Sequence, residues 1–136
     1  MKRLVEKPFL QIFFDYETRT MHVIRPSETE NMTAEAYKTD TMEWAKIILD
    51  LKPVKILVDE TEMKYGIKPE LQDFMQKNLI IPAIGAGLKY VAMIVSKDLF
   101  SQVSIEQILE DKPSHGLTIR FFDEASDAID WLKKHG

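Results

Sequence analysis

The feature that most constrains the fold is a short aliphatic run at residues 54–59, Val-Lys-Ile-Leu-Val-Asp, which leads directly into Glu60. Its valines and its isoleucine are β-branched, and apolar residues fall on both alternating faces of the run. This pattern is typical of a central parallel strand that is covered on both sides. The carboxyl end of such a strand opens onto a loop where binding or chemistry can be placed. The sequence therefore predicts a buried strand at 54–59 with a candidate functional loop after it.

Other segments of the chain have strand or helix character. The expected strands cover residues 9–15, 20–25, 54–59, 89–95 and 118–122. The expected helices cover residues 34–51, about 69–81, about 104–111 and a final segment after Asp123. The first two strands should form an antiparallel hairpin, whereas the later strands alternate with helices and should lie parallel. We therefore expect a single α/β domain over residues 1–136, with a core from about 9 to 134, a five-stranded mixed sheet and about four helices.

The expected helices carry their own boundary signals. Thr33 is placed to cap the helix over 34–51. The apolar stripe that should face the core consists of Tyr37, Thr41, Trp44, Ala45, Ile48 and Leu51. Asp40 falls off this stripe and is expected on the solvent side. The next helix should end or bend near Ile81, because Pro82 follows it.

Composition excludes several classes of function. The 136 residues contain no cysteine, which excludes disulfides, thiolate catalysis and cysteine metal sites. The net charge of −4 gives no general attraction to nucleic acid. No apolar run approaches the roughly 18 residues of a membrane span, and charged residues interrupt the N-terminal segment before a signal peptide could form. We expect a cytoplasmic protein without a transmembrane segment or a nucleic-acid partner.

The residues that could carry catalysis or bind a metal are scattered. The three histidines, His22, His115 and His135, fall in different expected elements without the spacing of metal ligands. No serine stands in a strand-turn-helix nucleophile motif. The sequence therefore predicts no catalytic residue, no metal site and no cofactor, and it places His22 on the outer face of the sheet.

A phosphoacceptor arrangement has partial matches in Asp59, Asp15 and Ser96. The last strand, however, ends at Asp123 without the lysine that would neutralise a transferred phosphoryl group. Asp15 should also lie at the wrong end of a parallel sheet, because it ends the first strand of the hairpin. An enzyme that accepts a phosphoryl group or hydrolyses its substrate is therefore the third choice for this chain.

Apolar residues suggest two further binding surfaces. A candidate pocket for a lipid or another apolar ligand would be lined by Ile81, Ile84, Leu88, Leu99, Phe100 and Val103. The alternative is that these residues pack on each other. One face of the sheet should be mixed rather than purely apolar, and it could mediate self-association. The candidate residues for that contact are Phe9, Phe13, Ile24 and Phe122.

Three segments together carry a family resemblance: Val54–Asp59, Tyr90–Val95 and the run from Arg120 to Leu132, which contains Phe-Asp-Glu-Ala and Trp-Leu. In these segments the chain resembles the bacterial STAS-like (SpoIIAA-like) proteins, which are relatives of anti-sigma-factor antagonists. A neighbouring grouping links that family to the CRAL-TRIO lipid-exchange fold. The resemblance covers residues from about 9 to 134.

The resemblance implies a small mixed sheet with packed helices and no catalytic machinery. In the antagonist branch, the loop after the central strand carries a serine that becomes phosphorylated. The corresponding loop here is Asp59-Glu60-Thr61-Glu62, in which Thr61 is the nearest hydroxyl and two glutamates flank it. A phosphate between two carboxylates is disfavoured unless cations are near, so the loop departs from the family pattern.

Together these observations predict a non-catalytic binding or regulatory module of the STAS-like type that acts through a protein partner or by self-association. The alternative is a carrier or sensor of a lipid or another small apolar ligand, which would use the apolar pocket. The loop from Asp59 to Glu62 is the candidate regulatory site.

Overall fold

The computed structural model describes residues 1–101 and 116–135. The strands are β1 (Lys2–Lys7), β2 (Leu10–Asp15), β3 (Thr20–Ile24), β4 (Lys55–Asp59), β5 (Tyr90–Ile94) and β6 (Thr118–Phe122). The helices are the 3₁₀ turn η1 (Ser27–Asn31), α1 (Ala34–Leu51), α2 (Pro69–Met75), the π turn η2 (Gln76–Ile80), α3 (Ile81–Gly85), α4 (Lys97–Phe100) and α6 (Ala125–Lys134). The predicted α/β class is confirmed. The helix predicted at 104–111 lies outside the described residues.

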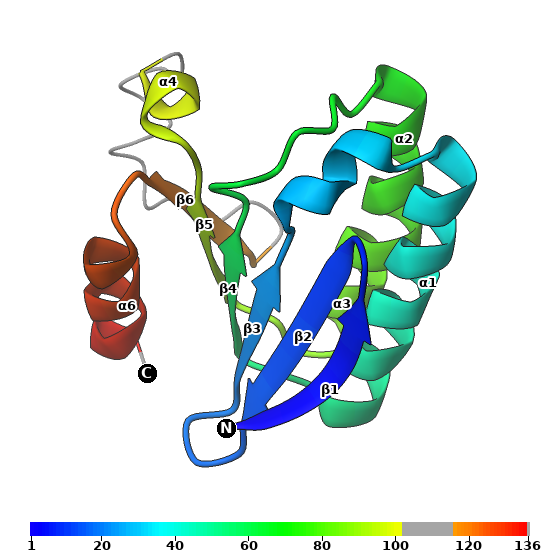
Figure 1. The fold of residues 1–136 in the computed structure, drawn as a ribbon. Helices are drawn as coiled ribbons and strands as arrows, with labels where there is room; N and C mark the ends of the chain where they lie inside the picture. The colour runs from blue at the N-terminus through cyan, green and yellow to red at the C-terminus, as the bar shows by residue number, and fades with distance from the viewer. Residues whose placement is uncertain (102–115, 136) are drawn as a thin grey trace.

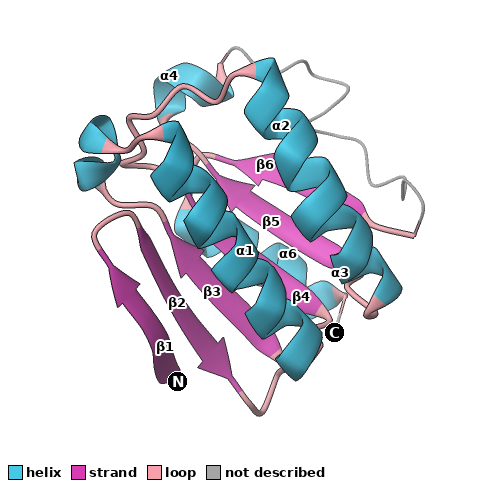
Figure 2. Ribbon diagram, turned by 90° about the vertical axis from the view of Figure 1, so that its right-hand side faces the viewer, coloured by secondary structure: helices cyan, strands magenta, loops and turns pink. Residues whose placement is uncertain are grey.

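The strands form one mixed sheet in the order β1-β2-β3-β4-β5-β6 (Figure 2). The pairs β1/β2 and β2/β3 are antiparallel, and the pairs β3/β4, β4/β5 and β5/β6 are parallel. The segments that begin at Val54 and Tyr90 lie side by side in the same direction, with Ile56 opposite Val91. The predicted arrangement, an N-terminal hairpin followed by parallel strands, is therefore confirmed.

The predicted number of five strands is wrong, because β1 adds a sixth strand at the edge of the sheet. Charged residues dominate this strand, and Val5 is its one buried residue. An edge strand commonly carries charges that discourage pairing with another chain, and these charges hide the apolar alternation from a sequence pattern. Within β1 the register also shifts between Arg3 and Val5, which breaks the period of two further.

Helices cover the two faces of the sheet unequally (Figure 1). The helices α1, α2 and α3 lie on one face, over a core that includes Phe14, Val23 and Ile56. On the second face α6 packs against β4, β5 and β6. Among the described residues, no helix covers the second face of β1 and β2, so the sheet is closed on one side and only partly covered on the other.

Helix α1 has the predicted bounds and the predicted cap. The Thr33 hydroxyl accepts a hydrogen bond from the backbone N–H of Ala36, at 3.1 Å. The prediction for Asp40 is wrong, because this aspartate is only 2 % exposed. A periodicity argument places a carboxylate outside the core by its polarity alone. Here Lys7 and Arg25 supply the positive charges that allow Asp40 to be buried.

The helical run that begins at Pro69 continues to Gly85, so of the two predicted alternatives, an end or a bend near Ile81, the end is wrong, and the helix is irregular just before that residue. It does not continue as a regular α-helix, because the π turn η2 interrupts it. Pro82 lacks a backbone N–H and would disturb a regular α-helix at this point, and the π turn just before it changes the local hydrogen-bond pattern. Within the described ranges, no helix is both long and apolar enough to cross a membrane.

Candidate functional site

The predicted regulatory loop follows β4 at the carboxyl edge of the parallel strands. Its first residues are tied down, since the Glu60 N–H donates to the Ile94 carbonyl at 2.8 Å. The Asp59 carboxylate accepts a hydrogen bond from the Thr61 N–H at 3.0 Å. The Thr61 and Glu62 side chains are exposed. The loop is therefore an ordered turn whose hydroxyl group faces solvent.

Arg25, which the sequence pattern did not single out, lies beside this loop. Its backbone N–H donates to the Asp59 carbonyl at 2.9 Å, and its side chain is 1 % exposed. The guanidinium Nη1 donates to the Phe9 carbonyl at 3.0 Å. The guanidinium carbon lies 5.5 Å from the centre of the Tyr37 ring and 5.9 Å from that of Trp44. Arg25 is thus enclosed by two aromatic rings rather than by water.

Three charged residues, Lys7, Asp40 and Glu43, connect Arg25 to the edge of the sheet, and we call these three together with Arg25 the Arg25 network. The Lys7 ammonium lies 2.6 Å from Asp40 Oδ1 and 3.0 Å from Glu43 Oε2. Asp40 Oδ2 lies 3.9 Å from Arg25 Nη1. The hydrogen bond to Asp40 raises the pKa of Lys7 above its ordinary value, against the effect of burial. These contacts join the β1–β2 hairpin, β3 and α1.

Burial also changes the titration of two groups that face Arg25. It raises the pKa of the Tyr37 hydroxyl to about 12, although the nearby Arg25 charge opposes the shift. It likewise raises the pKa of Glu60, with Arg25 again opposing and Asp59 adding to the increase. In both cases the loss of water outweighs the attraction of the cation. The contacts of Arg25 therefore have a structural role: they hold the loop after β4 against β3 and α1.

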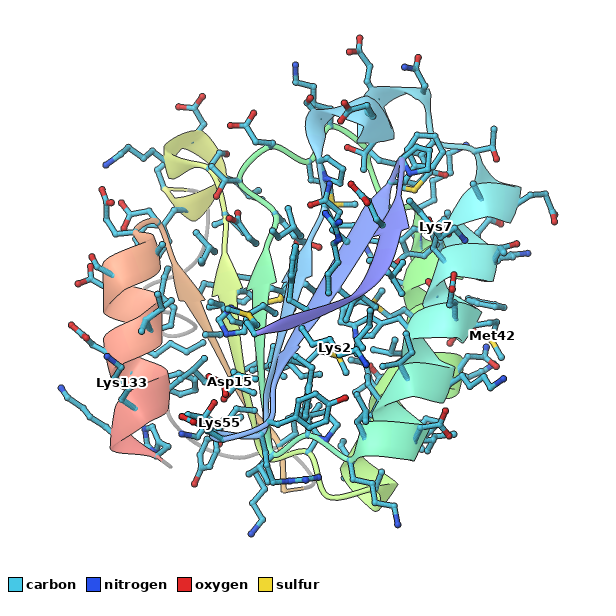
Figure 3. The ribbon with its side chains drawn as sticks, turned by 60° about the horizontal axis from the view of Figure 1, so that its bottom comes forward. Lys2, Lys7, Asp15, Met42, Lys55 and Lys133 are labelled. Carbon is cyan, nitrogen blue, oxygen red and sulfur yellow. The ribbon has the colours of Figure 1, made fainter. Side chains whose placement is uncertain are left out.

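A cavity of about 200 Å³ lies on the other face of the sheet, between the sheet and α6, near the amino ends of the parallel strands β3 and β4. It is lined by Met1, Asp15, Thr18, Thr20, His22, Lys55, Leu57, Ile129, Leu132 and Lys133. We call it the α6 cleft. Figure 3 shows Asp15 and Lys55 in the space between α6 and the sheet, with Lys133 on the helix.

Strand register explains why these side chains converge. Asp15 pairs with Thr20, and Thr20 pairs with Lys55, so the three residues form one row across β2, β3 and β4. His22 pairs with Leu57 in a second row, two residues further along β3. Residues that are opposite each other or two apart on neighbouring strands point to the same face of a sheet. The polar residues of the α6 cleft are therefore fixed by the backbone of the sheet.

Lys55 is the unusual member of this set. The residue is 6 % exposed, and in the part of the chain that the structure describes its ammonium group has no hydrogen-bond or ion-pair partner. By contrast, the exposed Lys97 lies 3.0 Å from Glu124. Lys55 thus presents an uncompensated positive charge to the cleft.

The other polar residues of the cleft are already constrained. The Asp15 carboxylate accepts hydrogen bonds from the N–H groups of Glu17 and Thr18, at 3.0 and 3.4 Å. The Thr18 hydroxyl donates to the Thr20 hydroxyl at 2.9 Å. Burial lowers the pKa of His22, although the Asp15 charge opposes the shift, so the imidazole is neutral at pH 7. The prediction that His22 lies on the outer sheet face needs correction, because it is half-buried in the cleft.

Apolar side chains from both the sheet and α6 complete the lining of the cleft. Leu57 is buried on β4, while Leu132 is buried on α6. Ile129 precedes Leu132 by three positions, so both lie on the same side of the helix, and Ile129 is 37 % exposed. Lys133 is exposed at the rim of the cleft. The site thus combines a polar floor, supplied by strands, with an apolar wall.

A larger groove of about 450 Å³ lies between α1 and α2, but its charges are already compensated. Lys77 pairs with Asp73 at 3.0 Å, and the Lys38 ammonium lies 5.6 Å from the centre of the Phe74 ring. Lys77 and Lys38 therefore already have partners within the protein. We favour the smaller α6 cleft as the candidate site because of its unpaired lysine.

The residues of the predicted apolar pocket do not come together. Ile81, Ile84 and Leu88 precede β5, and Leu99 and Phe100 follow it, so the two groups lie at opposite ends of this strand. Leu88 is buried in the main core, whereas Ile81 and Leu99 are 56 % and 48 % exposed. Val103, the last predicted member, lies outside the described residues.

The residues predicted for self-association also separate. Phe122 is buried beneath α6, with its ring centre 5.8 Å from that of Trp131. Phe9 packs beside Tyr37 on the other side of the sheet. Phe13 and Ile24 are half-buried on the second face, in β2 and β3. Only these two could belong to one continuous contact surface.

Asp15 was predicted to lie at the wrong end of the parallel strands for a phosphoacceptor site. This position is confirmed, because Asp15 and Asp59 lie at opposite ends of the strands. Asp15 shares a row with Lys55 at the beginning of β4, whereas Asp59 ends that strand. His135 follows α6 and stacks on Tyr90, with ring centres 4.7 Å apart, and His115 lies outside the described residues. The described residues contain no group of three or more histidine and carboxylate side chains that could hold a metal ion.

The sequence contained a signal for the α6 cleft. Lys55 is the one charge between the aliphatic residues of the run at 54–58. A charge at this place in a buried strand is itself unusual, since lysine is rarely fully buried without a partner. No family model, curated protein or solved structure matches this chain, so the STAS-like resemblance stays a prediction and its function must be argued from the geometry of the α6 cleft.

Proposed function

We propose that this protein is a non-catalytic binding module of the STAS-like type that holds a small molecule in the α6 cleft. The observation that supports this proposal is Lys55, a residue that is 6 % exposed and whose ammonium group lacks a partner within the described ranges. An unpaired cation in a cleft with apolar lining is suited to bind a polar or anionic group of a ligand. A ligand that supplies the missing acceptor would stabilise the folded protein when it binds.

The composition of the cleft supports a small-molecule ligand. Small-molecule sites are commonly concave and largely apolar, with a few polar groups that fix the orientation of the ligand. Here β2, β3 and β4 supply the polar groups, and Leu57, Ile129 and Leu132 supply the apolar surface. A volume of about 200 Å³ is below the roughly 300 Å³ at which drug-sized pockets begin, so the ligand should be small.

The contacts of His22 support binding rather than catalysis. Nucleophilic catalysis needs a nucleophile and a base within hydrogen-bond reach of each other. Among the described residues, His22 forms no hydrogen bond with the threonine hydroxyls or with Asp15. The cleft therefore presents one unpaired lysine and a shaped surface without an assembled nucleophile–base pair.

A regulatory role would act through α6, since this helix both lines the cleft and packs on β4, β5 and β6. A ligand that contacts Ile129 and Leu132 would add contacts that hold the helix against the sheet. Occupancy of the cleft could then be recognised by a partner protein as a change in the stability of α6.

The proposal is tested by ¹H–¹⁵N NMR with a panel of charged and neutral compounds of up to about ten non-hydrogen atoms. We expect at least one compound to shift the amides of His22, Lys55 and Ile129 more than those of the groove between α1 and α2. Ile129→Glu should abolish these shifts because it places a carboxylate on the apolar wall. Ile81→Glu is the matched control, since Ile81 is an exposed isoleucine far from the cleft. A panel that leaves all cleft amides unchanged would contradict the proposal.

A further inference from the structure

We infer that the Arg25 network contains a binding site for one internal water molecule, which is held jointly by Arg25, Asp40 and Trp44. The site lies between the end of β3 and α1, on the face of the sheet opposite the α6 cleft. It is therefore separate from the small-molecule site proposed above. The Tyr37 and Trp44 rings shield Arg25 from bulk solvent, so a water bound here is part of the protein interior.

Three buried polar atoms of this region have no hydrogen-bond partner among the described residues: Arg25 Nη2, Asp40 Oδ2 and Trp44 Nε1. Their residues are 1 %, 2 % and 5 % exposed, respectively. In folded proteins, buried polar atoms are nearly always hydrogen-bonded, and ordered water supplies the partner where the protein does not. Three such atoms in one region therefore point to a shared partner.

The side chains that carry these atoms pack together. Asp40 Oδ2 lies 3.9 Å from Arg25 Nη1, within ion-pair distance but beyond the roughly 3.2 Å of a hydrogen bond. The guanidinium carbon of Arg25 lies 5.9 Å from the centre of the Trp44 ring. Asp40 and Trp44 are four positions apart on α1, so they are neighbours on its surface. Polar groups at such separations are commonly joined by a bridging water.

Other contacts hold Arg25 and Asp40 in their present orientations. Arg25 Nη1 donates to the Phe9 carbonyl at 3.0 Å, and Asp40 Oδ1 lies 2.6 Å from the Lys7 ammonium. Turning the guanidinium and the carboxylate toward each other would disturb both of these contacts. A molecule between them satisfies Nη2 and Oδ2 without that disturbance.

The donors and acceptors of the site select water as its ligand. Arg25 Nη2 and Trp44 Nε1 can only donate hydrogen bonds, whereas the Asp40 carboxylate can only accept them. The bound molecule must therefore accept two hydrogen bonds and donate one. Water does both, and buried waters typically make about three hydrogen bonds. A chloride ion has no proton to donate to Asp40, and a metal cation has no lone pair for Arg25 or Trp44.

The test uses the two indole N–H signals of the ¹⁵N-labelled parent protein, which come from Trp44 and Trp131. The Nε1 atoms of both residues are buried and unpaired among the described residues, but Trp131 lies in an apolar cluster with Phe122 and Leu132. We expect NOE and ROE spectra to show a contact between water and the Trp44 indole proton, with the signs of a long-held water. Absence of this contact, or an equal contact at Trp131, would overturn the inference.

Variants at Asp40 identify the acceptor. Asp40→Leu replaces the carboxylate with an apolar group and should abolish the contact between water and the Trp44 indole. Asp40→Asn is the matched control, because its amide keeps an acceptor oxygen and removes only the charge, so the contact should persist. Tyr37→Phe should also retain it, which excludes transfer relayed through the Tyr37 hydroxyl proton. A contact that survives in folded Asp40→Leu, or disappears in Tyr37→Phe, would show that the inference is wrong.

A high-resolution crystal structure of the parent protein tests the site without any substitution, and so does not depend on whether Asp40→Leu folds. We expect one water within hydrogen-bond distance of Arg25 Nη2, Asp40 Oδ2 and Trp44 Nε1. A direct hydrogen bond between Arg25 Nη2 and Asp40 Oδ2, with no water between them, would overturn the inference. None of these outcomes bears on ligand binding in the α6 cleft, which is tested separately.

Discussion

At the scale of single residues, Lys55 is where the requirements of folding and binding diverge. Its backbone belongs to a central strand, and its ammonium group lies in the α6 cleft without a partner among the described residues. A residue chosen for stability alone would be apolar at this position. A charge that weakens the fold is commonly found where a site requires it.

This reasoning predicts that Lys55→Met stabilises the ligand-free protein. We expect the free energy of unfolding at pH 7 to rise by about 1 kcal/mol, since methionine fills the same 6 % exposed site without a charge that the cleft partly removes from water. For a chain of this length, that corresponds to a rise in Tm of about 3–5 °C. Urea denaturation measures the change, and Lys46→Met should stay within about 0.5 kcal/mol of the parent. A Lys55→Met protein less stable than the parent would show that the ammonium has a stabilising partner.

Glu60 supplies a second test at this scale, because burial raises the pKa of its carboxyl. A carboxyl whose folded pKa is raised contributes stability below its unfolded pKa, and this contribution is lost as the pH rises through the folded pKa. Glu60→Gln should therefore increase the free energy of unfolding at pH 7. The increase should shrink as the pH falls below the ordinary pKa of 4.5.

The matched control for Glu60 is Glu62→Gln, since Glu62 is exposed in the same loop. For Glu62→Gln we expect the free energy of unfolding to change with pH as it does in the parent protein. Chemical denaturation at pH 7 and pH 4 compares the three proteins. If Glu60→Gln is destabilising at pH 7, the attraction of Arg25 for the carboxylate exceeds the effect of burial.

At the scale of elements, α1 does more than cover the sheet. Asp40 on its inner side pairs with Lys7 and lies 3.9 Å from Arg25, so the helix is joined electrostatically to both the N-terminal hairpin and β3. The charges in the Arg25 network depend on each other, because Asp40 is the buried anion between two cations. Removal of Asp40 would leave the buried guanidinium without the carboxylate that lies 3.9 Å away.

We therefore expect Asp40→Asn to lower the free energy of unfolding by about 3 kcal/mol, in the range found when one partner of a buried ion pair is removed. Asp50→Asn, a substitution at an exposed aspartate of the same helix, should change it by less than about 0.5 kcal/mol. Thermal or urea denaturation distinguishes the two. Equal effects of both substitutions would mean that the Arg25 network contributes little to the stability of the fold.

The sequence predicted best those elements whose boundary residues and apolar pattern indicate the same structure. Helix α1 combines the Thr33 cap, a continuous apolar stripe and Pro53 after its end, and its bounds match the prediction. The strands β4 and β5 are aliphatic and short, so their parallel pairing followed from the helix between them. The edge strand β1 was missed because charges and a register shift conceal its alternation.

The candidate site was harder to predict than the fold, for a physical reason. The α6 cleft draws residues from β2, β3, β4 and α6, and their spacing along the chain carries no motif. What unites Asp15, Thr20 and Lys55 is a row across three strands, which requires the strand order and the register to be known. Asp40 was misplaced for a similar reason, since its partners Lys7 and Arg25 come from other elements.

At the scale of the whole molecule, the unequal helix layers create the cleft. Three helices cover one face of the sheet, while α6 alone packs against β4, β5 and β6 on the other (Figure 1). The boundary between the covered and uncovered parts of this second face passes beside β3, where His22 is half-buried in the cleft. A second full helical layer would bury His22, whereas a bare sheet would leave it in water.

The strand order of the sheet has a consequence for how the protein is made. Each strand lies beside the strand that precedes it in the chain, from β1 to β6. No strand has to be inserted between two that are already paired, so the sheet can lengthen at one edge while the ribosome is still adding residues. Pairing between chain neighbours also keeps loop closure short, which favours rapid folding. The polypeptide is thus suited to fold progressively during its own synthesis, beginning with the N-terminal hairpin.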